Sequence, residues 1–165
     1  MNVEVSITEG RTEHLSEIRG LILEWGYSVN ESQAREWLMA LLESPSHQIW
    51  VAISDAAVVG WAVAERRISI RELFTSEITG LVVSANVRRA GVGRLLVQAV
   101  EDWSRAKGLS RVVVRSNVSR SESHGFYPSI GFEHTKTTHV YVKSPKVIQK
   151  PLSNACLICP AFVLR

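Results

Sequence analysis

Cysteine is nearly absent from this chain of 165 residues, which contains only Cys156 and Cys159. Both lie among the last ten residues, which excludes a disulfide framework as the device that holds the fold together. A single Cys-x-x-Cys is also a weak zinc or redox signal, because neither a second pair nor a thioredoxin-like pattern accompanies it. The five histidines show no metal-ligand spacing with Asp, Glu or Cys, and we predict no metal site.

Long apolar runs are absent as well. None approaches the roughly 18 residues that a membrane span needs, and the first residues lack the basic segment and apolar core of a secretory leader. We therefore expect a cytoplasmic protein with no membrane partner. A composition of 45% apolar and 21% charged residues, without repeats, predicts one globular domain, which we assign to residues 1–143. Residues 144–165 contain three prolines and no periodicity, and we interpret them as a C-terminal tail.

Charge is distributed unevenly along the chain. Residues 1–80 hold 12 acidic and 6 basic side chains, whereas residues 81–165 hold 4 acidic and 13 basic ones. The second half therefore suits an anion and the first half a cation. A nucleic-acid binder would show a continuous positive face with stacking aromatics in a recognised module. Here the positive charge gathers on one loop and one helix, so we expect no nucleic-acid partner.

Hydrophobic periodicity predicts alternating strands and helices, hence a mixed α/β fold. Strands are expected at residues 3–7, 48–54, 58–67, 77–83, 112–115 and 137–142. Helices are expected at residues 15–22, 34–42 and 121–130, with Asn30 or Ser32 as a cap for the second. The strongest helix has one apolar face that runs from Val92 to Trp103, and Gly108 marks its end.

A basic, glycine-containing segment lies between a predicted strand and the strongest helix. It reads Arg88-Arg89-Ala90-Gly91-Val92-Gly93-Arg94. A helix N-terminus offers unpaired N–H groups, glycines allow close approach to the backbone, and arginines bind a pyrophosphate in bidentate fashion. A Walker loop is excluded because Gly-Lys-Ser/Thr is missing, and a dinucleotide fingerprint is excluded because Leu96 stands at its third glycine. The segment predicts a phosphate-binding loop of another kind.

Two motifs together resemble the GNAT superfamily of N-acetyltransferases. The family's cofactor-loop pattern appears as Arg88-x-x-Gly91-x-Gly93 after residues 80–83. About 25 residues further, a second segment resembles the family's other motif, Ser116-Asn117-x-x-Arg120-x-x-Ser123-His124-x-Phe126-Tyr127-x-x-x-Gly131-Phe132. The resemblance covers roughly residues 3–143. It implies an α/β (α+β) fold with a mixed, mostly antiparallel sheet of six or seven strands, about four flanking helices, and a cleft where the fourth and fifth strands splay apart.

The same resemblance implies acetyl-coenzyme A (acetyl-CoA) as cofactor and N-acetyl transfer as activity. The cofactor-binding residues that it implies are the strand residues Leu81, Val82 and Val83, the loop residues Arg88, Arg89, Ala90, Gly91, Val92, Gly93 and Arg94, and Asn117 and Tyr127. Ala90 departs from the glycine that many members have at this position, but it keeps the backbone amide.

An alkyl amine with a pKa near 10.4 must lose a proton before it attacks a thioester, and the departing thiolate must gain one. Glu77 lies eleven residues before Arg88, a spacing at which several family members carry a glutamate base. The alternative is that Glu77 is an ordinary polar residue of the strand. Tyr127 occupies the family's acid position, with helix packing as the alternative. The amide of Val83 is expected to stabilise the developing oxyanion. His124 lies one turn before Tyr127 on the same predicted helix. It either reaches the same side of the cleft as Tyr127 or is a packing residue.

The loop between the first two predicted helices is expected to border the acceptor. We predict Trp25, Tyr27, Glu77 and His124 as substrate residues, and we favour a small primary amine, attacked directly in a ternary complex. The aromatic and acidic residues of this loop suit an amine with an apolar body, and the acidic first half favours a small cationic amine, such as a polyamine, an aminoglycoside-like compound or an amino-acid derivative. A peptide or protein amine, a non-catalytic CoA-binding sensor and a homodimer all remain open.

Overall fold

The computed structural model describes residues 4–144, and the chain divides into two units, Met1–Glu133 and His134–Arg165. All the helices and strands that it describes belong to the first unit. The predicted tail from residue 145 onward, with Cys156 and Cys159, lies outside the described residues, so the boundary at residue 143 stays a prediction. No helix within residues 4–144 combines the length and apolarity needed to cross a membrane.

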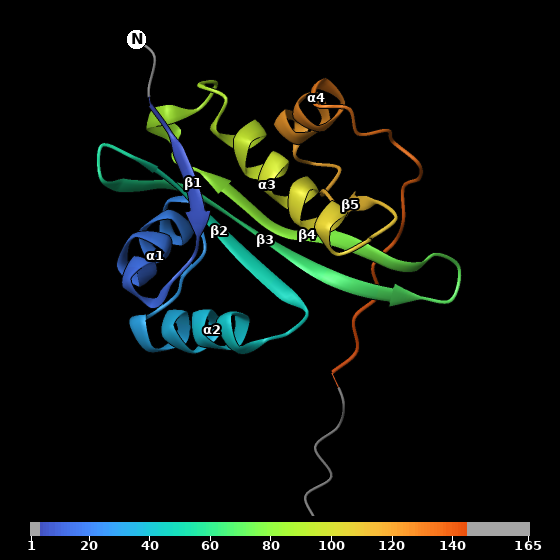
Figure 1. Ribbon diagram of the computed structural model, residues 1–165, viewed down its shortest axis with the longest axis horizontal. Coiled ribbons are helices and arrows are strands. Elements are labelled where there is room, and N and C mark those ends of the chain that lie inside the picture. The colour runs from blue at the N-terminus through green and yellow to red at the C-terminus, as the bar shows by residue number, and fades with distance from the viewer. Residues whose placement is uncertain (1–3, 145–165) are drawn as a thin grey trace, which may run out of the picture. The chain divides into compact units, whose positions relative to one another are not determined.

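Five strands form one sheet in the order β1-β2-β3-β4-β5 (Figure 1). Neighbouring strands run antiparallel except β4 and β5, which are parallel. The bounds are β1 (Ser6–Glu9), β2 (His47–Ser54), β3 (Ala57–Ser69), β4 (Leu73–Val83) and β5 (Val112–Val114). The mixed, mostly antiparallel sheet confirms the predicted fold class.

Helices cover both faces of the sheet (Figure 1). On one face lie α1 (Leu15–Glu24) and α2 (Glu31–Glu43), and on the other lie α3 (Val92–Ala106) and α4 (Ser121–Ser129). Because β2 is buried from both sides, its sequence is a continuous apolar run: Ile49 and Val51 pack with α1 and α2, whereas Trp50 and Ala52 pack with α3. Two short 3₁₀ helices, Thr12–His14 and Ala85–Val87, complete the unit.

The helix ends follow local capping rules. Asn30 is the N-cap of α2: its Oδ1 accepts a hydrogen bond from Gln33 N at 2.8 Å, and the Gln33 side chain accepts one from Asn30 N at 3.1 Å. At the far end of α3, Gly108 adopts φ = +65°, a left-handed conformation that glycine reaches without a Cβ clash. Both ends lie where the sequence pattern predicts them.

A bulge in β4 opens the sheet. Val63 of β3 pairs with Gly80 and the next residue, Ala64, pairs with Ile78, which leaves Thr79 without a partner in the register. The parallel pairing with β5 extends only over Ser76–Ile78, so within residues 4–144 this edge of β4 has no strand neighbour beyond the bulge. This divergence is the splaying that the family resemblance implies for the fourth and fifth strands.

The strand count is lower than the predicted six or seven, because residues 137–142 form no strand. Their alternating pattern predicts one, but a strand also needs a hydrogen-bonded neighbour and a buried face. Here Val140, Tyr141 and Val142 are at least 83% exposed. Conversely, the β3–β4 hairpin is longer than predicted: β3 runs to Ser69, and β4 begins at Leu73 rather than Glu77.

Candidate functional site

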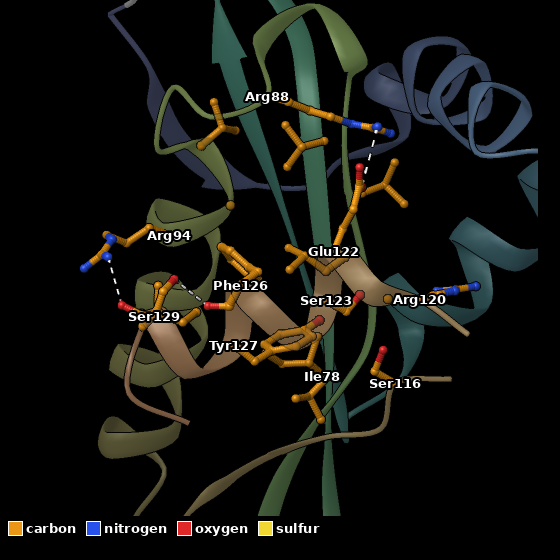
Figure 2. Close-up of a pocket in the computed structure, with 18 of the residues that line it drawn as sticks. Ile78, Arg88, Arg94, Ser116, Arg120, Glu122, Ser123, Phe126, Tyr127 and Ser129 are labelled. Carbon is orange, nitrogen blue, oxygen red and sulfur yellow. Dashed lines mark hydrogen bonds and ion pairs between the residues drawn. The ribbon is translucent and has the colours of Figure 1, made fainter. Parts of the chain in front are cut away.

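A cleft of about 1000 Å³ occupies the gap between diverging β4 and β5. The walls are the open edge of β4, the loop before α3, the end of β5 and one side of α4 (Figure 2). The predicted cofactor residues that line it are Leu81, Val82, Val83, Arg88, Arg89, Gly91, Val92, Gly93, Arg94 and Tyr127. The segments of the two motifs, which are far apart in the sequence, therefore line one cleft.

The loop before α3 has a backbone shaped for an anion. Arg89 and Gly91 adopt φ of +63° and +84°, and left-handed residues in a turn direct successive N–H groups to one side. Gly91 is the N-cap of α3, and no side chain within residues 4–144 caps this end by accepting a hydrogen bond. The first N–H groups of the helix, at the positive end of its dipole, are thus left for a ligand.

Arginines surround this backbone site. Arg88, Arg89 and Arg94 all line the cleft. Arg94 Nη2 donates to the carbonyl oxygen of Ser129 at 3.2 Å, and Arg88 Nη1 lies 3.9 Å from Glu122 Oε2 (Figure 2). Ala90, the loop residue that departs from the family pattern, is exposed and does not line the cleft.

The free edge of β4 offers backbone hydrogen bonds to the same cleft. Ser84 N donates to the carbonyl oxygen of Val59, on β3, at 2.9 Å. Because backbone groups of successive residues point to opposite sides of a strand, the N–H and C=O groups of Val83 and Leu81 point away from β3. On that side β5 has already diverged. The edge can therefore pair with an extended ligand.

Tyr127 enters the cleft from α4. Its ring packs edge-on against Phe126 and Phe132, at centroid distances of 5.1 and 5.5 Å. Burial raises the pKa of Tyr127 above the usual 10, and the positive charge of Arg120 opposes this shift. The hydroxyl therefore keeps its proton throughout the neutral range. Phe126 in turn fits against Gly93, where an added Cβ would lie 3.1 Å from the ring, so this glycine sets how closely α4 approaches α3.

Besides Ala90, three predicted residues lie outside the cleft lining and outside the second cavity described below. The carboxylate of Glu77 pairs with Arg67 at 2.9 Å and with Arg115. Asn117 is exposed and its Oδ1 accepts hydrogen bonds from the backbone and hydroxyl of Ser119, both at 2.9 Å, so it shapes the loop. His124 is exposed and faces away from the lining, because α4 presents Ser123, Phe126 and Tyr127 instead.

Four residues of the second motif for which the sequence predicts no role line the cleft, namely Ser116, Arg120, Ser123 and Phe126. The hydroxyl of Ser116 is buried in the cleft wall and has no hydrogen-bond partner within residues 4–144, so it is available to a ligand. Arg120 lines the cleft, and its guanidinium lies 4.6 Å from the centre of the Trp25 ring. Ser116 directly follows the predicted strand 112–115, and this position at a strand end is the sequence signal that could have indicated a residue of the cleft wall.

A second cavity of about 590 Å³ lies on the other face of the sheet, beneath α1 and α2. Trp25 and Tyr27, both predicted as substrate residues, line it. Trp25, Thr79 and Gly80 belong to both cavities. Gly80 is required here, because an added Cβ would lie 2.5 Å from the Trp61 ring. The bulge of β4 is thus the point where the two cavities meet.

Comparison with known proteins explains this arrangement. The model of the acetyltransferase (GNAT) family matches residues 14–132, which is most of the chain. The chain belongs to this family. One relative is the uncharacterized N-acetyltransferase YhdJ of Bacillus subtilis (strain 168), 30% identical over 90 residues, which are 54% of this chain and 63% of YhdJ. The match thus spans less than two thirds of that protein. Another is aminoglycoside N(6')-acetyltransferase type 1 of Klebsiella aerogenes, 24% identical over 69% of this chain and 77% of that one.

Solved structures confirm the GNAT fold. The aminoglycoside N-acetyltransferase AAC(6')-Iy, in complex with CoA, superposes with a TM-score of 0.78. It is 22% identical, and the match covers 87% of this chain and 97% of that one. At this identity the likeness establishes the fold alone.

Proposed function

We propose that this protein is an acetyl-CoA-dependent N-acetyltransferase that transfers the acetyl group directly to the primary amine of a small molecule within a ternary complex. One observation carries the proposal: two cavities on opposite faces of the sheet share Trp25, Thr79 and Gly80 as lining residues. A donor in the first cavity and an acceptor in the second would approach each other there without a covalent enzyme intermediate.

The first cavity suits coenzyme A in three respects. Its loop pairs a backbone anion site with three arginines, as a pyrophosphate requires. The open edge of β4 at Leu81 and Val83 suits the amide groups of an extended pantetheine arm. The Ser116 hydroxyl, which has no hydrogen-bond partner in the described part of the chain, adds a further hydrogen-bonding group in the wall. When bound, acetyl-CoA supplies an acetyl group activated as a thioester.

Tyr127 is the residue that we propose as general acid. Its ring is held between Phe126 and Phe132, and its raised pKa keeps the hydroxyl protonated at the pH where the amine is acetylated. A neutral hydroxyl of this kind can give its proton to the sulfur as the C–S bond breaks, although the thiol that forms has the lower pKa of about 8.5. The proton that the nitrogen loses as the amide forms offsets the one that Tyr127 gives up. The N–H group of Val83, at the open edge of β4, is positioned to stabilise negative charge that develops beside it.

The proton of the incoming ammonium has no assigned acceptor. Glu77, the predicted base, is engaged by Arg67 and Arg115 outside both cavities. We propose that this ion-pair cluster holds β4 to β3 and β5, and that the amine loses its proton to water before it reaches Gly80. A base role for Glu77 would then require its carboxylate to leave both arginines.

Calorimetric titration of the full chain with acetyl-CoA tests the donor site, and thiol release in the presence of primary amines tests the transfer. We expect saturable binding and release well above the rate without amine. Binding without release for any amine would favour the CoA-binding sensor. An absence of binding would overturn the proposed function together with the role of Tyr127.

A further inference from the structure

We propose that the acceptor is a primary amine attached to an uncharged, aromatic body, and that polycations such as polyamines and aminoglycosides are poor substrates. This inference rests on the proposed function and specifies its second substrate. It departs from the cationic acceptor that the acidic first half of the sequence suggested. It also sets this protein apart from the aminoglycoside acetyltransferases that share its fold.

The second cavity is lined by apolar and aromatic side chains. Trp25 packs on Tyr27 at a centroid distance of 4.9 Å, and Trp37 meets Trp61 edge-on at 5.5 Å. Within residues 4–144, the lining contains no Asp, Glu, Lys or Arg; its remaining members are Ile22, Ser28, Val29, Ala34, Leu41, His47, Val63, Thr79 and Gly80. A flat apolar group is therefore favoured, whereas a second ammonium would lose hydration without gaining a carboxylate.

Two acidic residues that lie close to lining residues in the sequence are engaged by other groups. Glu24, at the end of α1, accepts hydrogen bonds from Ala85 N at 2.6 Å and from the Ser84 hydroxyl at 3.2 Å. Glu31, at the start of α2, pairs with Arg35 one turn later at 3.0 Å. Neither side chain belongs to the lining. The excess of acidic residues in the first half of the sequence thus does not create a negative acceptor site.

The junction between the two cavities carries a positive charge. The guanidinium of Arg120 lies over Trp25, a residue of both cavities, and Arg120 Nη2 is 3.4 Å from the Tyr27 hydroxyl. One face of the Trp25 ring is thereby taken by a cation, which leaves less of the aromatic surface for an ammonium. A like charge beside the path to Gly80 also repels a polycation more strongly than a monoamine.

The size of the second cavity does not discriminate between these acceptors. A volume of about 590 Å³ admits an aromatic amine or a sugar, so the lining chemistry decides. The few polar groups in the lining favour an acceptor with no more than one or two hydrogen-bonding groups besides its amine. His47 is one of them, and its Nδ1 is already 2.7 Å from the Ser44 hydroxyl.

Three probe amines test the inference: tryptamine as an aromatic monoamine, spermidine as a linear polycation and kanamycin as an aminoglycoside. Initial rates of thiol release from acetyl-CoA give kcat/KM for each. We expect the value for tryptamine to exceed the other two by about tenfold or more. Calorimetric titration of the CoA-saturated protein with tryptamine supplies a readout that does not depend on turnover or on any variant.

A matched pair of variants on α2 tests the site. Leu41 lines the second cavity, whereas Leu42, its neighbour on the same helix, is 38% exposed and outside the lining. Leu41→Glu should lower kcat/KM and affinity for tryptamine about tenfold and leave the KM for acetyl-CoA unchanged. Leu42→Glu should change neither. Circular dichroism checks that both variants fold.

The outcomes separate the two proposals. A higher kcat/KM for spermidine or kanamycin, no binding of tryptamine, or equal losses in Leu41→Glu and Leu42→Glu would overturn the acceptor inference while acetyl-CoA still bound. Loss of acetyl-CoA binding by the wild type would instead overturn the proposed function. Tryptamine binding that Leu41→Glu weakens, without any transfer, would support the acceptor class and refute the enzymatic step.

Discussion

Replacing Gly91 with alanine tests the phosphate loop most directly. Gly91 is the N-cap of α3 with φ = +84°, and a Cβ built there meets no atom within 4 Å. The substitution therefore creates no steric clash with a neighbour and acts only through the backbone. An L-residue in the left-handed region costs about 1–2 kcal/mol relative to glycine.

This cost sets the expected magnitude. If the loop relaxes to relieve the strain of an alanine at φ = +84°, the first N–H groups of α3 lose their orientation toward the phosphate, and acetyl-CoA has to restore that orientation on binding. A penalty of 1–2 kcal/mol corresponds to a Kd that is about 5- to 30-fold weaker. If the loop keeps its conformation instead, the same penalty appears as a loss of stability, and the Kd changes little.

Gly108 supplies the control. It lies at the other end of the same helix with φ = +65°, has equally open surroundings, and does not line the cleft. Calorimetry with acetyl-CoA and urea unfolding should be carried out on Gly91→Ala and Gly108→Ala together. We expect the Gly91 loop to relax, so that Gly108→Ala loses stability and Gly91→Ala loses affinity with a smaller loss of stability. Wild-type affinity in Gly91→Ala, together with a stability loss clearly smaller than that of Gly108→Ala, would mean that a relaxed loop still binds and would refute the role assigned to the loop amides.

Three further substitutions address the cleft and its surroundings. Tyr127→Phe should lower kcat about 10- to 100-fold with an unchanged Kd for acetyl-CoA; an unaltered kcat in this variant would assign Tyr127 to packing. In the wild type, deprotonation of Tyr127 should not lower kcat below about pH 10, because the raised pKa of Tyr127 retains the proton. Glu77→Gln should reduce the free energy of unfolding in urea by about 1–2 kcal/mol, a modest loss because its partners Arg67 and Arg115 are half exposed. The variant should preserve the shape of the pH–rate profile; a loss of activity near neutral pH that recovers at high pH would instead identify Glu77 as a base. Glu122→Gln removes a negative charge 3.9 Å from Arg88 and should tighten acetyl-CoA binding about twofold at low salt only; weaker binding would contradict a phosphate site at Arg88.

The local parts of the structure were predictable from the sequence. The capped start of α2, the glycine that ends α3 and the loop from Arg88 to Arg94 all depend on residues within a few positions of one another. Helix capping, left-handed backbone and the geometry of a helix N-terminus act over that range, so a single sequence contains enough information. For the same reason the phosphate site could be predicted without knowledge of the rest of the fold.

The positions of single side chains across the sheet were harder to predict from the sequence. Glu77 has the spacing of a base, but Arg67 and Arg115, distant in sequence, converge on it from the neighbouring strand β3 and from just after β5. Asn117 belongs to the motif, yet its side chain accepts hydrogen bonds from Ser119, and Ser116 is the residue that lies in the cleft wall. Residues 137–142 have the pattern of a strand, which needs a partner that no local pattern supplies.

The sequence by itself thus determined the fold class, the family and the phosphate loop, because these follow from short-range patterns of glycine, arginine and apolar residues. Only the tertiary structure decided the character of the proposed acceptor site. Two acidic residues of the first half, Glu24 and Glu31, bind Ala85, Ser84 and Arg35, while aromatic side chains from the loop between α1 and α2, from α2 and from β3 line the cavity. Net charge is a sum over the chain, whereas specificity depends on which few groups face the ligand, and folding selects them.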